Sequence, residues 1–131
     1  MTNNELMALA IEARERSYCK YSGFAVGAAL LAKSGKVYLG CNVESVSFSP
    51  TCCAERTAFF SAIAAGEREF SAIAVCGGKQ GEKKRSKCTP CGVCRQVMSE
   101  FCGKDFIIIM ENEDDTVTVT LDELLPFAFN I

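Results

Sequence analysis

The sequence predicts a single α/β domain built on about five strands. The chain has 131 residues, which fits one domain with one core. Hydrophobic residues make up 49% of it, which is enough to fill that core. Segments with helical spacing of apolar residues alternate along the chain with short apolar runs, and no internal repeat or linker interrupts them. We therefore expect residues 1–131 to form one domain.

The N-terminal third predicts a helix followed by a hairpin. Thr2 can cap a helix over residues 3–17, with Glu5 reaching back to the cap, and apolar residues then follow at helical spacing. Residues 24–45 contain two apolar runs on either side of the turn residues Ser34-Gly35, which is typical of two paired strands.

The middle of the chain predicts a buried helix and a central strand. Residues 53–65 carry no charge after Arg56 and are apolar on all sides, so this helix should be covered by other elements, and Gly66 should end it. Residues 70–78 form a short apolar run typical of a central strand. Residues 79–87 are polar and predict a loop.

The C-terminal third predicts one more helix, two strands and a short closing helix. Pro90 suits the start of a helix, and the residues after it form one apolar stripe. Residues 105–110 and 116–120 resemble strands, and residues 121–126 predict a short helix that ends at Pro126. The two apolar helices, 53–65 and the one after Pro90, should pack against the sheet.

Charge and hydropathy argue against several classes of partner. The formal net charge of −2 gives little reason to expect attraction to a nucleic-acid backbone. The N-terminal segment is charged and lacks the apolar region of a secretory signal. No stretch approaches the roughly 18 consecutive apolar residues of a membrane span. We expect a cytoplasmic protein that binds neither nucleic acid nor membrane.

The cysteines predict a metal site. The chain has nine, and in a reducing compartment clustered cysteines indicate metal binding or catalysis before disulfides. The adjacent Cys52 and Cys53 lie at one predicted helix start, and Cys91 and Cys94 lie at another as C-x-x-C. The positive end of a helix dipole favours thiolate over thiol. Three thiolates can hold zinc and leave its fourth position to water.

Glu55 and Arg56 follow the first ligand and suit the chemistry of such a site. A carboxylate beside the water can take its proton and pass it to a substrate. Residues two apart on a helix point in nearly opposite directions, so Cys53 and Glu55 can converge only if the helix end faces the metal. Three thiolates leave excess negative charge on zinc, and we expect Arg56 to withdraw part of it by hydrogen bonding to the ligand sulfurs.

These residues belong to a longer set of motifs that resembles one family. The motifs are "YSGFAVGAALL" at 21–31, "GCNVES" at 40–45, "CAERTA" at 53–58, "PCGVCRQ" at 90–96 and "ELLPFAF" at 123–129. In this order they resemble the zinc-dependent cytidine deaminases of the short, homotetrameric type. The resemblance implies a three-layer α/β/α fold with a mixed sheet of about five strands.

The resemblance also implies an activity. Such an enzyme deaminates cytidine and 2′-deoxycytidine to uridine and 2′-deoxyuridine in pyrimidine salvage. A water activated by one zinc per chain would attack C4, and Glu55 would be the proton shuttle. No organic cofactor is expected.

Substrate-binding roles follow from the same resemblance, residue by residue. Asn42 and Glu44 would hold the ribose hydroxyls, Phe24 would stack on the pyrimidine, and the backbone at Ala54 would contact the base. Phe129 would close over the site of a neighbouring subunit in the homotetramer, so that sites are shared between chains.

The chain departs from the family pattern at several positions, among them Phe48, Cys52 and Lys20, which stands where proline is common. Phe48 stands where the family often has tyrosine, so a polar contact from that side chain is lost. Cys52 is an extra thiol beside the first ligand, and we expect it to lie outside the metal site.

Other functions remain open at this point. Deaminases acting on blasticidin S share the metal motifs. Deaminases acting on polynucleotides need a basic or stacking channel, whereas this chain offers only the basic loop 79–87. Cys52 could complete a closed four-thiolate structural zinc site. "CTPCGVC" at 88–94 resembles part of an iron–sulfur ligand run.

Overall fold

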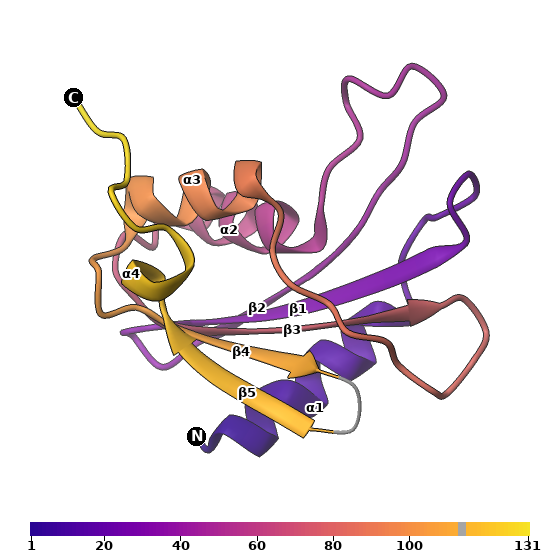
Figure 1. Ribbon diagram of the computed structural model, residues 1–131, viewed down its shortest axis with the longest axis horizontal. Helices are drawn as coiled ribbons and strands as arrows, with labels where there is room; N and C mark the ends of the chain where they lie inside the picture. The colour runs from indigo at the N-terminus through magenta and orange to yellow at the C-terminus, as the bar shows by residue number, and fades with distance from the viewer. Residues whose placement is uncertain (113–114) are drawn as a thin grey trace.

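The computed structural model describes residues 1–112 and 115–131 (Figure 1). The helices and strands follow one another as α1 (Asn3–Arg14), β1 (Phe24–Ala32), β2 (Val37–Cys41), α2 (Ala54–Ala64), β3 (Phe70–Lys79), α3 (Gly92–Phe101), β4 (Ile107–Asn112), β5 (Asp115–Thr120) and α4 (Leu121–Leu124). The five strands form one sheet in the order β2-β1-β3-β4-β5. Only β3 and β4 pair in parallel, so the sheet is mixed, and β3 is its central strand as predicted.

Helices cover both faces of this sheet, which confirms the three-layer α/β/α fold (Figure 1). Helices α2 and α3 lie on one face and α1 lies on the other. Neighbouring strand residues point to opposite faces. Leu30 therefore joins the core beneath Phe59 of α2, while Ala29 joins the core beneath Leu6 of α1. The core is consequently divided into two apolar layers by the sheet.

Helix α1 is shorter than predicted. The capping box of Thr2 and Glu5 is present, but the helix ends at Arg14, whereas the sequence predicted residue 17. After Arg14 the backbone N–H groups of Arg16 and Ser17 bond to carbonyl oxygens three residues back, at 3.0 and 3.2 Å, so the last turn is tighter than an α-helix. The N–H of Tyr18 then bonds to the carbonyl oxygen of Asn42, at 2.9 Å, a contact with a distant segment that local periodicity does not encode.

Two glycines let the helices approach the sheet closely. A Cβ on Gly40 of β2 would lie 2.2 Å from the carbonyl oxygen of Ala54 and 2.6 Å from the backbone nitrogen of Ala58, both in α2. A Cβ on Gly27 of β1 would lie 2.0 Å from the carbonyl oxygen of Ala10 in α1. Because backbone atoms cannot move aside cheaply, these positions fix how near α1 and α2 lie to the sheet.

Within the part of the chain that the structure describes, no helix combines the length and the apolar character needed to cross a bilayer.

Substitution of Gly40 should test this close approach. Gly40→Ala pushes α2 away from β2, and we expect it to lower the free energy of unfolding by about 1–3 kcal/mol, as overpacking of a tight contact does. Urea denaturation of the purified variant measures the change. Gly92→Ala is the matched control, because a Cβ there meets nothing within 4 Å. If Gly40→Ala were as stable as Gly92→Ala, the close contact would not constrain α2.

Candidate metal centre and substrate pocket

Three cysteine sulfurs from two helix starts lie together on one side of the sheet. Cys53 is the N-cap of α2, Cys91 is the N-cap of α3, and Cys94 lies in the first turn of α3. Their Sγ atoms all lie within 4.8 Å of one another. The Sγ atom of Cys91 is 3.8 Å from that of Cys53 and 3.6 Å from that of Cys94.

These spacings fit a zinc ion. Tetrahedral coordination with zinc–sulfur bonds of about 2.3 Å places ligand sulfurs about 3.8 Å apart. The two measured separations agree with that value, and no other group of three potential ligands lies together among residues 1–112 and 115–131. Cys53, Cys91 and Cys94 therefore fit one zinc per chain.

The surroundings of Cys53 favour its thiolate. A hydrogen bond from the Cys94 thiol lowers the pKa of Cys53 to about 5, and the Arg56 guanidinium and Cys91 add to the effect against the opposing cost of burial. The Nη2 atom of Arg56 donates to the Sγ atom of Cys53 at 3.3 Å. Since a metal binds the thiolate and not the thiol, this site is prepared for a cation.

Arg56 faces the sulfurs and makes no ion pair with any carboxylate in the described part of the chain. Its hydrogen bonds to Cys53 and then Cys94 raise the pKa of its guanidinium, because the positive form is the one that donates to sulfur. Arg56 therefore lies within hydrogen-bonding distance of the sulfur cluster.

Glu55 is buried at the start of α2, with 4% of its surface exposed. Burial raises the pKa of its carboxyl to about 7. Cys53 as N-cap and Glu55 as the second helical residue both reach the same pocket, because the end of the helix and not its side faces that pocket. This is the arrangement that the two-residue spacing requires.

The pocket beside the sulfurs has a volume of about 330 Å³. Residues expected in the site from the sequence line it: Phe24, Asn42, Glu44, Cys53, Ala54, Glu55 and Cys91. These residues come from β1, from the segment after β2 and from the starts of α2 and α3. The strand ends and the two helix starts together enclose one cavity with mostly apolar walls.

Asn42 and Glu44 are held by the backbone of neighbouring segments. Asn42 accepts from the Val26 N–H at 2.9 Å and donates to the Phe24 carbonyl at 2.8 Å. Glu44 accepts from the backbone N–H groups of Tyr21 and Ser22, both at 3.0 Å. A hydrogen bond from the Ser22 hydroxyl, with that from the Ser22 N–H, lowers the pKa of Glu44. Each side chain therefore has a fixed orientation and still has unused hydrogen-bonding capacity.

The structure does not bring Phe129 to the pocket of its own chain. Phe129 is 71% exposed, and its carbonyl oxygen accepts from Gln96 Nε2 at 3.0 Å on α3. The other candidate residues meet within one chain, whereas this one lies on the outer surface.

Cys52 lies next to the metal cluster without joining it. It lines the pocket, but its sulfur is not among the three that meet. Its backbone pairs with that of Val43, and burial raises the pKa of its thiol.

Sequence reasoning missed Thr57, which fixes the start of α2. Its Oγ1 atom accepts from the Cys41 N–H at 3.0 Å and lies 2.9 Å from the carbonyl oxygens of Cys41 and Ala54. The hydroxyl thus ties the end of β2 to the first turn that carries Cys53 and Glu55. A threonine in the first turn of a helix gives no sign of this, because the contact depends on how closely β2 approaches.

Comparison with known proteins identifies similar chains of nearly the same length. Residues 1–110 match the family described as "Cytidine and deoxycytidylate deaminase zinc-binding region". A cytidine deaminase from Sporosarcina psychrophila is 45% identical over 131 residues, which cover 99% of this chain and 93% of that protein. The crystal structure of cytidine deaminase from Burkholderia pseudomallei superposes with a TM-score of 0.89 and 46% identity, covering 98% of this chain and 100% of that one.

A blasticidin-S deaminase from Bacillus cereus is a more distant relative. It is 34% identical over 107 residues, covering 79% of this chain and 76% of that protein. The match is shorter and lower in identity than those with the two cytidine deaminases.

Cys53 belongs to the three-sulfur cluster and Cys52 does not, so substituting each in turn tests which cysteines bind the metal. Cys53→Ser should lose zinc, because a ligand thiolate is removed, whereas Cys52→Ser should retain about one zinc per chain. Metal content per chain, measured by atomic emission on purified protein, compares the two variants. Loss of zinc from Cys52→Ser to the same extent would mean that the site holds four thiolates.

Proposed function

This chain belongs to the zinc-dependent cytidine and deoxycytidylate deaminases and is an enzyme that deaminates cytidine, and we propose that Glu55 carries the proton transfers of this reaction. The reaction is a hydrolysis at C4, in which cytidine and water give uridine and ammonia. We include 2′-deoxycytidine among the substrates. The observation that carries the proposal is the buried Glu55 carboxyl, which lines the pocket beside the three-sulfur cluster.

Cys53, Cys91 and Cys94 would hold the zinc. When bound there, zinc supplies a Lewis acid that lowers the pKa of water to about 7. Two helix N-termini reach this point, and their dipoles stabilise the negative charge of the thiolates. The cluster itself thus needs no histidine, an amino acid that the chain lacks.

Glu55 moves the protons. Its carboxylate accepts a proton from the attacking water and delivers it to N3 of the cytosine ring, which loses its aromatic stabilisation as C4 becomes tetrahedral. It then takes the second proton from the oxygen now bonded to C4 and delivers it to the amino group, so that the C4–N bond breaks, ammonia leaves and the C4 carbonyl of uridine remains. A carboxyl whose pKa burial raises to about 7 both accepts and returns a proton near neutral pH.

The remaining pocket residues orient the nucleoside. The ring of Phe24 offers an apolar surface on which the pyrimidine stacks. Asn42 has one N–H left to donate, and the Glu44 carboxylate can accept from a ribose hydroxyl, since their other contacts hold them to the backbone. The backbone at Ala54 contacts the base. Fixed contacts of this kind improve the geometry of attack.

Arg56 adjusts the charge of the sulfurs. Its hydrogen bond to Cys53 withdraws negative charge from a ligand set that carries one negative charge more than zinc neutralises. With less charge on the sulfurs, a metal at this site polarises water more strongly.

We propose further that residues 1–131 form one deaminase domain that assembles as a homotetramer with sites shared between chains. The exposed ring of Phe129 supports this assembly, because it lies outside its own pocket and is free to reach a second copy.

We propose a cytoplasmic location, where nine free cysteines stay reduced, and a role in pyrimidine salvage without nucleic-acid or membrane partners.

Substitution of Glu55 tests the central proposal. Glu55→Ala should retain about one zinc per chain but lose deamination by at least about 100-fold, the contribution expected of a general acid–base residue. Ultraviolet absorbance follows cytidine conversion, and metal analysis of the same sample follows zinc. Turnover within tenfold of the parent enzyme would refute the proton-transfer role. Faster conversion of blasticidin S than of cytidine by the parent would instead identify the other substrate.

Arg56 has its own test. Arg56→Ala should lower kcat at neutral pH by about 10- to 100-fold, the range seen when a group bonded to a metal ligand is removed. Arg16→Ala is the matched control, because the Arg16 side chain is 63% exposed and forms an ion pair only with Glu12 within residues 1–112 and 115–131. Steady-state kinetics measure kcat of Arg56→Ala and Arg16→Ala at neutral pH. Full activity of Arg56→Ala would exclude the charge-adjusting role.

A further inference from the structure

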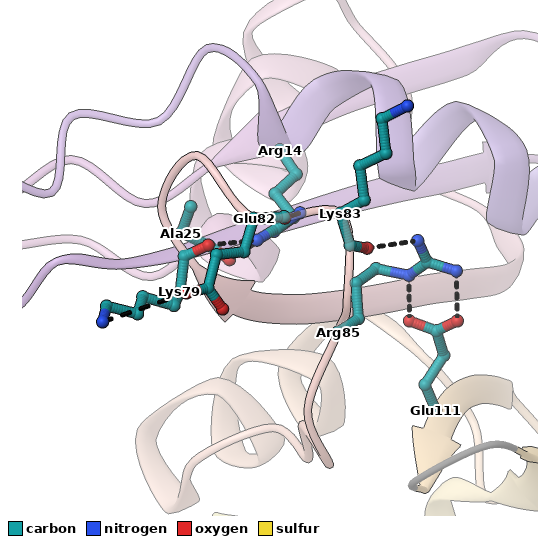
Figure 2. Close-up of polar contacts among 7 residues, drawn as sticks. All are labelled: Arg14, Ala25, Lys79, Glu82, Lys83, Arg85 and Glu111. Carbon is teal, nitrogen blue, oxygen red and sulfur yellow. Dashed lines mark hydrogen bonds and ion pairs between the residues drawn. The ribbon is translucent and has the colours of Figure 1, made fainter.

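The basic loop 79–87 has no part in the site as described so far, yet charged side chains attach it firmly to the fold. It leaves the end of β3 and leads directly to Cys88, Thr89 and the ligand Cys91. Figure 2 shows Arg14 and Arg85, the two arginines that hold the loop. The loop is therefore a defined structure joined to the metal-binding segment.

Arg14 holds the first half of the loop. Its side chain comes from the last turn of α1 and is buried, with 3% of the residue exposed. It donates to the carbonyl oxygens of Lys79 at 2.8 Å, Glu82 at 3.1 Å and Ala25 at 3.1 Å (Figure 2). Among the residues described, no carboxylate pairs with Arg14, so these carbonyls are what offsets its buried charge.

Arg85 holds the second half through a two-point ion pair. Its Nε and Nη2 atoms donate to Glu111 Oε1 at 2.7 Å and Oε2 at 3.0 Å (Figure 2). The Arg85 side chain is 29% exposed and the Glu111 side chain is 12% exposed, so solvent screens this pair only in part. Paired hydrogen bonds in a fixed geometry restrict both partners more than a single contact does.

Glu111 contacts the same segment a second time, closer to the metal. Its backbone carbonyl on β4 accepts from the Cys88 N–H at 3.2 Å. Between these two contacts, the Ser86 N–H bonds to the Gly77 carbonyl at 2.8 Å. The chain from Arg85 to Cys88 is thus fastened to β3 and β4 three residues before Cys91.

The fastened segment forms a wall of the pocket. Cys88, Thr89 and Cys91 line the cavity together with Phe24. The Cys88 sulfur and the Phe24 ring both lie against Gly77, where an added Cβ would be 2.9 Å from the sulfur and 2.7 Å from the ring. The position of Cys88 relative to Phe24 is consequently tightly set, and a shift of residues 85–88 would move this wall.

We propose that Arg85 and Glu111 are positioning residues of the active site, whose ion pair holds the segment 85–91 so that Cys88 and Thr89 line the substrate pocket and Cys91 reaches the metal. Arg14 supports them by anchoring the start of the same loop. The inference rests on the proposed function of the pocket. It gives the loop a role within the enzyme, while its four lysines remain solvated.

Glu111→Gln in the full-length, zinc-loaded enzyme tests the proposal. The variant keeps the size of the side chain but loses the charge that holds Arg85. We expect zinc release to the chelator 4-(2-pyridylazo)resorcinol to be about three- to tenfold faster and KM for cytidine to rise by a similar factor, because contacting groups couple at this level. We expect kcat to change less than KM, since Glu55 and Cys53 lie on α2.

Glu82→Gln is the matched control, with the same chemical change in the same loop. Its side chain is 57% exposed and, among the residues that the structure describes, its carboxylate pairs only with Lys79, so zinc release and KM should match those of the parent. Arg85→Lys keeps the charge but not the two-point geometry, and we expect an effect between those of the parent and Glu111→Gln. If Glu111→Gln does not fold, zinc release and KM of Arg85→Lys test the positioning role in its place.

The outcomes separate a positioning role from a merely structural one. If Glu111→Gln, or Arg85→Lys in its place, unfolds at lower temperature but releases zinc and binds cytidine as the parent does, the proposal is wrong. Zinc release is measured without substrate, so it remains informative even if cytidine were not the substrate.

Discussion

The active centre depends on two helix N-termini meeting above the sheet. Helix α2 brings Cys53 and α3 brings Cys91 and Cys94, and the three sulfurs lie within 4.8 Å of one another. Gly40 and Thr57 set where α2 begins, through a close backbone approach and a hydroxyl that bonds to the end of β2. Arg95 secures α3 by donating to the carbonyls of Pro90 and Leu124, both at 2.8 Å. Contacts with β2 therefore position the start of α2, and contacts with the residues around Pro90 and Leu124 position the start of α3.

Much of this arrangement could be predicted from the sequence. The alternation of helical and strand periods predicted the α/β fold, the hairpin and the central position of β3, because these features follow from local apolar patterns. Clustered cysteines at two predicted helix starts indicated a metal site, and the resemblance to the family selected Cys53 over Cys52 beside Cys91 and Cys94. The resemblance added Asn42 and Glu44, whose types alone do not distinguish a ribose contact from a turn.

The rest depends on contacts between segments that are distant in the sequence. The segment after α1 bonds through Tyr18 to Asn42, and Thr57 bonds to Cys41. Arg85 and Glu111 are 26 residues apart in the sequence. From sequence alone a basic loop is expected to be solvent-exposed, because nothing local indicates that Arg85 pairs with Glu111 on β4. Phe129 is exposed and lies outside the pocket of its own chain, so the contacts of one chain do not test its expected role.

X-ray absorption at the zinc edge of the purified enzyme tests the central claim most directly. We predict three sulfur neighbours at about 2.3 Å and one lighter oxygen neighbour, since the Cys53, Cys91 and Cys94 cluster fits one zinc and three ligands would leave the fourth position to water. Four sulfur neighbours would contradict the account, because Cys52 would then close the site and leave no position for the reacting water.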